Sequence, residues 1–209
     1  MTPEIIAADP AWPYTKAKTA VLAAAAFVIR ERGPRAATLK NIATKAGITE
    51  PAIFRHFEGI DGLFHGLFDA YERIYGRIGG SYDDKNLFGI VRFRQGILSG
   101  VDIIAASRDF SYILVHAEQV FRGYPELKVK VAEIKLKDQE SILSALAEAK
   151  ERGEVRSDVD AMSIVTSVLG MIYMTIIFWI ESEFAFDLRA LCETRIEDSV
   201  RLIGQPACE

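Results

Sequence analysis

The sequence predicts an all-α fold divided into an N-terminal and a C-terminal helical part. Apolar residues recur at spacings of three and four along most of the chain, whereas alternating apolar and polar stretches are nearly absent. Half of the 209 residues are hydrophobic, which suffices for one good core, or for one core with a small appended domain. Glycine and proline end several of the helical stretches, and no convincing strand lies between them.

The first helix is predicted over residues 15–32, TKAKTAVLAAAAFVIRER, which is rich in alanine and is ended by Gly33 and Pro34. A longer helix is predicted from Asp61 to Ile78, with apolar residues on adjoining faces. The segment GGSYDDKN, which starts at Gly79, is the natural boundary. We therefore assign residues 1–60 to an N-terminal domain, residues 61–78 to a connecting helix, and residues 79–209 to a C-terminal domain.

Between these helices, the segment TLKNIATKAGITEPAIFRHF (residues 38–57) predicts two short helices joined by a tight turn. Thr38 is placed to cap the first helix, and Gly47 can adopt the left-handed conformation that ends it. Ile48 is expected in the core, and Thr49 is expected to cap the second helix. The buried face of the first helix has the spacing i, i+3, i+4 and i+7 and consists of Leu39, Ile42, Ala43 and Ala46.

The second short helix carries an arginine that is predicted to point outward. Ile53 and Phe57 define the inward side, and because successive residues are about 100° apart, Pro51 and Arg55 lie almost opposite them. The guanidinium fork of an outward arginine can pair with guanine O6 and N7 in the major groove of DNA. Two short helices with an exposed arginine also occur for packing alone, so the local pattern leaves both interpretations open.

The C-terminal half predicts five further helices, over residues 86–106, 108–122, 126–152, 159–183 and 188–203. The segment GYP at residues 123–125 separates two of them. Gly153 is a candidate C-terminal cap, and Ser157, Asp158 or Asp160 is a candidate N-cap for the helix that follows.

The order of three segments carries a family resemblance. A long first helix is followed by TLKNIATKAGITEPAIFRHF and then by EGIDGLFHGLFDAYERI, together covering about residues 15–78. This order resembles the DNA-binding domain of TetR-family transcriptional regulators, and AEAKERGEVRSDVDAMSIVTSVLGMIYMTIIFWIESEF resembles the family's last long helices. The resemblance implies an N-terminal three-helix helix-turn-helix DNA-binding domain and a C-terminal helical ligand-binding and dimerisation domain. It implies a ligand-responsive regulator, most simply a repressor released from a palindromic operator by a hydrophobic small molecule.

Carried over position by position, the resemblance also implies a set of DNA contacts. Phosphate contacts are expected from Thr38, Thr49 and His56, and base or groove contacts from Glu50, Pro51 and Arg55, with Lys40 near the DNA backbone. Phe54 belongs to the same surface, but it stands where the family commonly has a tyrosine, so the hydroxyl that would reach a phosphate is missing. Ile60 stands where the family commonly has a lysine. The candidates to compensate for this lost attraction are Lys16, Lys18, Arg35 and Lys45.

Residues 161–180, AMSIVTSVLGMIYMTIIFWI, carry no formal charge and are numerous enough to span a bilayer. Acidic flanks, four Ser or Thr side chains and the lack of clustered Lys or Arg argue against insertion. In water, a helix that is apolar on all sides must be covered. The resemblance implies cover by a second copy across a two-fold axis, whereas a core helix of a monomer is the alternative. The expected homodimer interface consists of Val165, Leu169, Ile172, Ile176, Leu188, Leu191, Ile196 and Val200.

The resemblance implies an effector cavity among the C-terminal helices, and such cavities are mostly apolar with a few orienting polar groups. His116, Tyr112 and Tyr173 are the polar candidates, although a histidine on an apolar helix is more often a satisfied core residue. We therefore expect a small hydrophobic effector. The expected ligand-binding residues are Phe93, Ile97, Tyr112, His116, Phe121, Tyr173, Met174 and Phe178.

Charge and cysteine usage limit the other classes of function. Residues 1–60 hold eight Lys/Arg against five Asp/Glu, a formal charge of +3. Because the whole chain has a formal charge of −4, residues 61–209 carry −7. Such asymmetry suggests a nucleic-acid face on the basic part, although a solvated helix surface gives the same count. The three histidines and two cysteines, Cys192 and Cys208, fit no metal spacing.

No catalytic triad, metal site, cofactor or glycine-rich phosphate loop is expected, so the sequence does not predict an enzyme. The N-terminus lacks the order of a secretory signal, and we expect the protein in the cytoplasm. A helical small-molecule or protein-interaction module without DNA binding is the alternative function.

Overall fold

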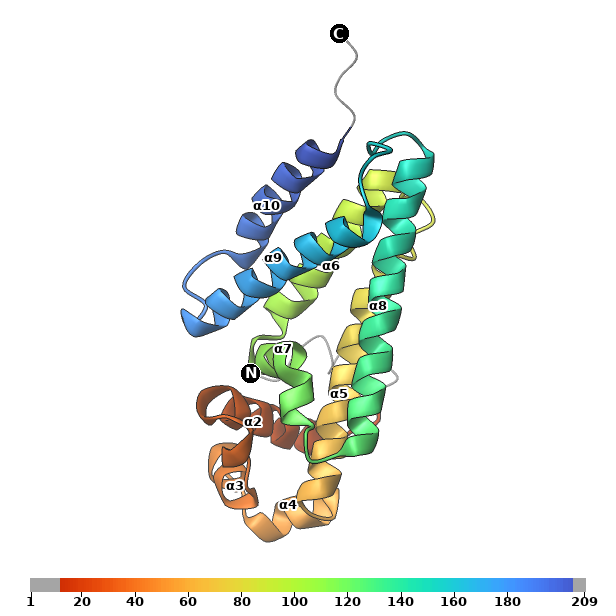
Figure 1. Cartoon of the computed structure of the whole chain (residues 1–209). Coiled ribbons are helices and arrows are strands. Elements are labelled where there is room, and N and C mark those ends of the chain that lie inside the picture. The colour runs from red at the N-terminus through yellow and green to blue at the C-terminus, as the bar shows by residue number, and fades with distance from the viewer. Residues whose placement is uncertain (1–11, 205–209) are drawn as a thin grey trace. The chain divides into compact units, whose positions relative to one another are not determined.

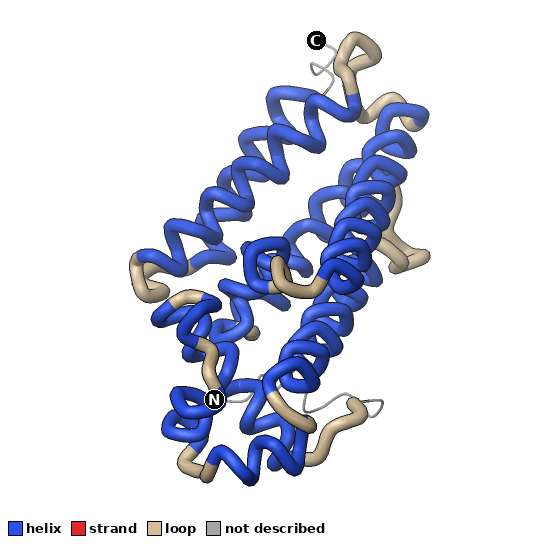
Figure 2. Tube along the Cα trace, turned by 60° about the horizontal axis from the view of Figure 1, so that its bottom comes forward, coloured by secondary structure: helices blue, strands red, loops and turns tan. Residues whose placement is uncertain are grey.

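The computed structural model describes residues 12–204, and this part of the chain is built almost entirely from helices (Figures 1 and 2). The described residues contain no strand, only an isolated antiparallel bridge between Val155 and Gly204. Cys208 lies outside the described residues. The prediction of an all-α fold is confirmed.

Most helix ends agree with the prediction to within about three residues. The predicted helix over 108–122 is instead a short 3-10 turn followed by an α-helix, and the backbone of His116 is non-helical inside it. The helix expected from residue 86 begins at Gly89, whose φ of +55° departs from helical geometry. The elements are α2 (Lys16–Arg32), η1 (Pro34–Ala36), α3 (Leu39–Ala46), α4 (Glu50–Phe57), α5 (Ile60–Gly80), α6 (Gly89–Ala106), η2 (Arg108–Phe110), α7 (Ser111–Val120), α8 (Pro125–Glu151), α9 (Ala161–Glu181) and α10 (Leu188–Ile203).

The chain divides into two compact units. Among the described residues, unit 1 holds 12–75 together with Ile104–Glu133, and unit 2 holds Gly76–Ile103 together with 134–204. Unit 1 therefore contains α2, α3, α4 and most of α5, and it also takes α7 and the first turns of α8 from the C-terminal half. The division between domains near residue 79 stays a prediction.

Within unit 1, α7 and its flanking turns are tied to the N-terminal helices by polar contacts. Tyr75 donates to the carbonyl of Leu114 at 3.2 Å, and Tyr124 donates to Asp61 at 2.9 Å. An ion pair of 3.5 Å joins Arg30 of α2 to the carboxylate of Asp109. These partners lie 39 to 79 residues apart in the sequence, so the N-terminal helices and the segment 104–133 form one packed body.

The junction between α4 and α5 depends on glycines. Glu58 ends α4 with φ +58°, and Gly59 follows with φ +117°, which L side chains rarely adopt. At Gly62 an added Cβ would lie 1.8 Å from the carbonyl oxygen of Phe57, so no side chain fits there. At Gly66 an added Cβ would lie about 3 Å from Leu22 and Phe57. The main chain of α5 thus approaches the end of α4 directly.

In unit 2, charged side chains join α6 to α8 and α10. Arg92 donates to Glu148 of α8 at 3.0 Å, and Arg94 donates to Glu193 and Glu197 of α10 at 2.9 and 2.8 Å. Because each guanidinium meets a carboxylate on another helix, these pairs fix how the helices of unit 2 pack.

One carboxylate in unit 2 is poorly satisfied. Asp138 of α8 has an oxygen that is buried without a hydrogen-bond partner, and burial raises its pKa to about 6. Its charge in turn helps to raise the pKa of buried Tyr82, for which burial is the larger cause. The ring of Tyr82 packs on Gly96, where an added Cβ would lie 2.2 Å from it.

The α9–α10 hairpin is closed by caps and by two side chains. Asp160 accepts a hydrogen bond from the N–H of Ser163 at 2.7 Å, so Asp160 is the N-cap among the three candidates. The predicted turn at Gly153, with φ +74°, is also confirmed. Trp179 donates its indole N–H to the carbonyl of Phe186 at 3.1 Å, and Arg195 of α10 donates to Thr175 of α9.

Candidate nucleic-acid interface

The turn between α3 and α4 is built by the backbone. Thr38 accepts a hydrogen bond from the N–H of Asn41 at 3.2 Å, and Gly47 has φ +69°, so both predicted signals are confirmed. The N–H of Ile48 returns to the carbonyl of Ala43 at 3.1 Å. The expectation that Ile48 is buried is wrong, because the turn is closed by main-chain bonds and the side chain is 37% exposed.

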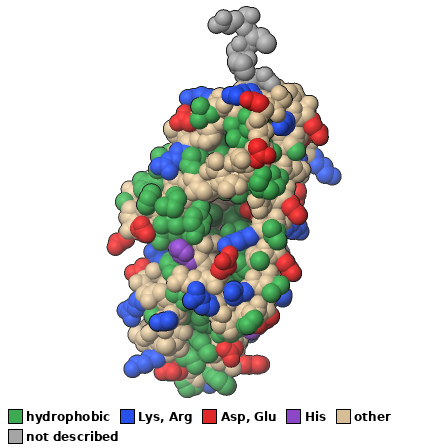
Figure 3. Space-filling view, viewed as in Figure 1, with side chains coloured by type: hydrophobic (Ala, Val, Ile, Leu, Met, Phe, Trp, Pro, Cys, Tyr) green, Lys and Arg blue, Asp and Glu red, His purple; other side chains and the backbone are tan. Residues whose placement is uncertain are grey.

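The α4 helix presents its arginine outward, as predicted. Ile53 and Phe57 are buried, whereas Pro51, Phe54 and Arg55 are exposed. These three exposed residues are spaced at i, i+3 and i+4 and therefore share one face of the helix. Figure 1 shows α4 at the end of unit 1, and Figure 3 shows hydrophobic side chains reaching the surface there beside acidic ones.

Thr49 stands at the N-cap position of α4, but its side chain makes no capping bond, so the expected cap is wrong. The physical reason lies in the first turn. Pro51 has no N–H to donate, and the N–H of Ala52 bonds to the main-chain carbonyl of Thr49 at 3.0 Å. The exposed hydroxyl of Thr49 therefore makes no hydrogen bond to any residue in the described part of the chain.

Several cations near this surface have no acidic partner. Lys40 and Arg55 are exposed, and neither forms an ion pair within residues 12–204. Lys16 and Arg35 are exposed in the same way, whereas Lys18 lies 5.5 Å from the ring of Tyr14 and 5.6 Å from that of Phe57. The remaining predicted DNA-binding residues are Glu50, which is exposed, and His56, which is half-buried.

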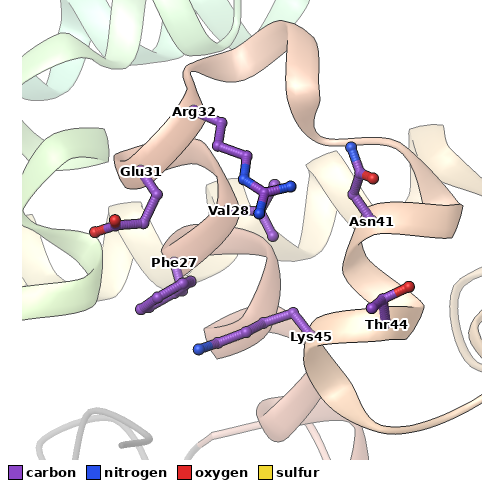
Figure 4. A pocket seen from close by; sticks show the side chains of 7 residues that line it. All are labelled: Phe27, Val28, Glu31, Arg32, Asn41, Thr44 and Lys45. Atoms are coloured by element: carbon purple, nitrogen blue, oxygen red, sulfur yellow. The ribbon is translucent and has the colours of Figure 1, made fainter.

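A surface hollow of about 280 Å³ lies between α2 and α3 in unit 1 (Figure 4). At the edge of this hollow, the ammonium of Lys45 lies over the ring of Phe27, 3.2 Å from the ring centre, and forms a cation–π contact. The hollow is lined by Phe27, Val28, Glu31, Arg32, Asn41, Thr44 and Lys45. None of the eight predicted ligand-binding residues lines it.

The predicted ligand-binding residues fall in both units. In unit 1, the rings of Tyr112 and His116 lie 4.5 Å apart on α7 and are half-buried. Phe121 is fully buried, 5.6 Å from the ring of Phe68 and 6.0 Å from that of Tyr71, and so belongs to the core of unit 1. In unit 2, Phe93 and Ile97 are buried on α6, whereas Tyr173, Met174 and Phe178 are exposed on α9.

The predicted dimer residues are mostly covered already within the single chain. Leu169, Leu191 and Val200 are half-buried, and buried in unit 2 are Val165, Ile172, Ile176, Leu188 and Ile196. An opposite stripe of α9, which we call the α9 stripe, is exposed and consists of Ser163, Thr166, Ser167, Gly170, Tyr173, Met174 and Phe178. Figure 3 shows hydrophobic side chains gathered over the C-terminal part of α9. In the N-terminal half of α9 the hydroxyl residues Ser163, Thr166 and Ser167 all lie in this stripe, a signal that could have identified the exposed side; farther along, every side is apolar.

The α9 helix is long and apolar enough to cross a membrane by length and composition, with a mean hydropathy of 2.0 in its most apolar window. Only 28% of that window is buried within the chain, so α9 needs further cover in water.

No group of three or more potential metal ligands occurs among residues 12–204. Cys192 is buried, and burial raises the pKa of its thiol to about 11, which keeps it protonated at neutral pH.

Three comparisons with known proteins agree with this geometry. Residues 21–67 match the family model described as "Bacterial regulatory proteins, tetR family". The chain is 28% identical over 185 residues to the HTH-type transcriptional repressor BepR of Brucella suis biovar 1 (strain 1330). This alignment covers 82% of this chain and 84% of that protein.

Two solved structures share the fold. The ketosteroid transcriptional regulator KstR2 of Mycobacterium tuberculosis superposes with a TM-score of 0.80 at 15% identity, over 92% of this chain and 97% of that chain. The transcriptional regulator FadR from Bacillus subtilis, in complex with stearoyl-CoA, superposes with a TM-score of 0.66 at 21% identity, over 87% and 96%. The predicted architecture, a helix-turn-helix domain followed by a helical C-terminal domain, is confirmed.

Proposed function

We propose that the chain, which belongs to the TetR family of DNA-binding transcriptional regulators, is a repressor that a hydrophobic small molecule releases from a palindromic operator. The relative that is 28% identical is named as a repressor, and this supports repression over activation. We place the protein in the cytoplasm, with its operator.

The observation that carries the proposal is the orientation of α4. Arg55 points to solvent while Ile53 and Phe57 hold the opposite side of the helix in the core of unit 1. A short helix with this arrangement can lie in the major groove, where the guanidinium fork pairs with guanine. Glu50 and Pro51 precede Arg55 on the same helix and are exposed, so they can add groove contacts.

Phosphate contacts would anchor α4 in the groove. The hydroxyl of Thr49 makes no hydrogen bond within the described residues, so it can donate to a phosphate oxygen without breaking an existing bond. Thr38 is different, because its oxygen already caps α3, although its hydroxyl proton remains available. Lys40 adds an unpaired cation beside Thr38, and His56 completes the set.

We propose that two copies pair through α9 and α10. The α9 stripe leaves Tyr173, Met174 and Phe178 exposed, and a contiguous apolar surface of this kind is rarely left open on a monomer. Small residues at its N-terminal half, Ser167 and Gly170 among them, would let two helices approach closely. A two-fold pair places two α4 helices on one duplex, and such readers bind half-sites about 34 to 36 Å apart.

The effector is proposed to be hydrophobic. The FadR structure contains stearoyl-CoA, which has a long apolar chain, and this supports an apolar ligand class for a protein of the same fold. Of the three polar candidates, Tyr112 and His116 lie on α7, where the non-helical backbone at His116 marks a break, whereas Tyr173 is exposed in the α9 stripe. Release requires differential affinity of about 1 to 3 kcal/mol between the DNA-bound and free states.

The test starts from duplex selection with the purified full-length protein. We expect a palindromic sequence to be enriched from a random library, and binding to it to weaken steeply between 50 and 200 mM salt. Analytical ultracentrifugation of the same sample should give a particle of about twice 23.2 kDa. If no duplex is enriched and low salt reveals no affinity, the alternative of a helical module without DNA binding is correct.

A further inference from the structure

We propose that Phe54 reads the C5-methyl group of a thymine in the operator, beside the base pair that Arg55 contacts. The inference rests on the proposed DNA-reading function and adds a second, apolar element of sequence recognition to it.

The position of Phe54 gives it access to the groove. Its side chain is 58% exposed and shares the outer face of α4 with Pro51 and Arg55. Any surface that receives the guanidinium of Arg55 therefore also meets the ring of Phe54. An aromatic ring left this open in water gains from being covered by an apolar partner.

The ring is also held in place by the main chain. An added Cβ at Gly59 would lie 3.5 Å from Cε2 and 3.8 Å from Cδ2 of Phe54, so one edge of the ring rests against Gly59. Gly59 itself is buried and has φ +117°, which fixes the support. A side chain that is ordered before binding loses less rotamer freedom when it meets its partner.

The chemistry of the ring selects thymine. Phe54 has no hydroxyl, so it cannot donate to a phosphate oxygen. Among the groups that the four base pairs display in the major groove, the C5-methyl of thymine is the one apolar group. Ile48, which is 37% exposed in the turn before α4, adds apolar surface to the same helix-turn-helix segment.

A protein partner is the competing occupant for an exposed phenylalanine. Two cations of α3 and α4 favour DNA, because Lys40 and Arg55 are exposed and have no acidic partner in residues 12–204. An apolar protein surface would have to bury these cations unpaired, whereas the groove supplies phosphates and base acceptors around the methyl group.

The experiment removes one methyl group at a time. On the selected operator, each thymine is replaced by deoxyuridine in both half-sites, and the Kd of the wild-type full-length protein is measured. We expect one symmetric position at which this change weakens binding, by about 4-fold for each half-site, as one buried methyl group predicts. Phe54→Ala should weaken binding to the thymine operator by at least that factor and abolish the effect of deoxyuridine.

Two further variants sharpen the result. Phe88→Ala removes another exposed phenylalanine, 51% exposed in unit 2, and should leave all Kd values unchanged. Phe54→Leu keeps an apolar side chain and should retain part of the deoxyuridine effect. Since Phe54 is exposed, its variants should keep the melting temperature of the wild type.

The outcomes separate the possibilities. If deoxyuridine weakens Phe54→Ala and the wild type equally, another residue reads the methyl group and the proposal is wrong. It is equally wrong if no thymine position is sensitive, or if Phe54→Ala weakens all sequences alike. Failure of the proposed function would look different, because no operator would be enriched in the first place.

Discussion

Arg94 of α6 donates from one guanidinium nitrogen to Glu197 of α10 at 2.8 Å, and the same nitrogen reaches Glu193 at 2.9 Å. Arg189 extends this contact by meeting Asp102 of α6, so α10 is joined to α6 at two levels. The charged groups are part-exposed, and their attraction is screened by salt.

Arg94→Met should lower the free energy of unfolding by roughly 1 kcal/mol at low salt, because Glu193 and Glu197 lose their closest cation. Urea unfolding at 50 mM and 1 M NaCl measures the effect, and the gap between variant and wild type should narrow at high salt. Arg201→Met is the control, since Arg201 is a solvent-exposed partner of Glu197 and Asp198 and should matter little. An equal loss for both variants would contradict the special role of Arg94.

Arg55→Ala should weaken operator binding by about 1 to 3 kcal/mol and relax the preference at one base pair, because the guanidinium is proposed to pair with guanine. Lys40→Ala should weaken binding to all sequences alike and reduce the salt slope by about 1, as expected for a phosphate contact. Fluorescence anisotropy with the operator and its single-base variants distinguishes the two. Wild-type affinity in both variants would show that the proposed contacts are wrong.

Thr38→Ala and Thr49→Ala form a matched pair at two N-cap positions. Thr38 makes its capping bond, so its removal should cost about 1 kcal/mol of unfolding free energy. Thr49 makes none, so its removal should change stability by less than about 0.5 kcal/mol. Both should weaken DNA binding. Thermal unfolding and operator titration of the two proteins test this contrast, which a large stability loss in Thr49→Ala would refute.

Phe178→Glu places a charge in the α9 stripe, where Phe178 is 52% exposed, and should shift the protein from dimer to monomer. Leu136→Glu, at an equally exposed apolar position of α8, is the control and should leave the dimer intact. Sedimentation velocity over a range of concentrations gives the dissociation constants. Dimers of unchanged affinity in Phe178→Glu would place the interface elsewhere.

Asp138 should make stability fall as the pH rises. Burial raises its pKa from 3.8 to about 6, so the folded chain binds this proton more tightly than the unfolded chain. Below about pH 4 the protonated carboxyl makes its full contribution to the free energy of unfolding. This contribution, about 3 kcal/mol by the size of the pKa shift, is lost as the pH rises past 6. Asp138→Asn should remove this slope and be more stable than the wild type at pH 7.5.

Urea unfolding between pH 4 and 8 measures the slope, and Glu140→Gln, an exposed carboxylate on the same helix, serves as the control. Parallel pH profiles for the wild type and Asp138→Asn would show that this carboxylate is solvated in solution.

Local sequence signals made much of the segment from α3 to α4 predictable. The cap at Thr38, the left-handed Gly47 and the inward side of α4 follow from residue type and helical period, which act over a few residues. The missing cap at Thr49 has a local cause as well, because Pro51 has no N–H and the N–H of Ala52 bonds to the main-chain carbonyl of Thr49 instead of its hydroxyl. Ile48 differs from the prediction, because an apolar residue after a turn need not be buried.

The packing of segments that are distant in the chain could not be predicted from the sequence. The segment 104–133 joins unit 1 through pairs such as Arg30 and Asp109, which are distant in the chain and have no local signature. The exposed face of α9 has a local signal in its N-terminal half alone, where Ser163, Thr166 and Ser167 share it, because farther along every face of that helix is apolar. The orphaned oxygen of Asp138 depends on neighbours that only the folded chain brings together.

At Gly62 the backbone of α5 leaves no room for a side chain against the carbonyl of Phe57. The tilt of α4 thus depends on main-chain contact, while Pro51, Phe54 and Arg55 are exposed on its outer face. Operator preference can therefore drift, or be redesigned, by substitutions at those outer positions without disturbing the scaffold. Residue 62, in contrast, should tolerate no replacement in any functional descendant.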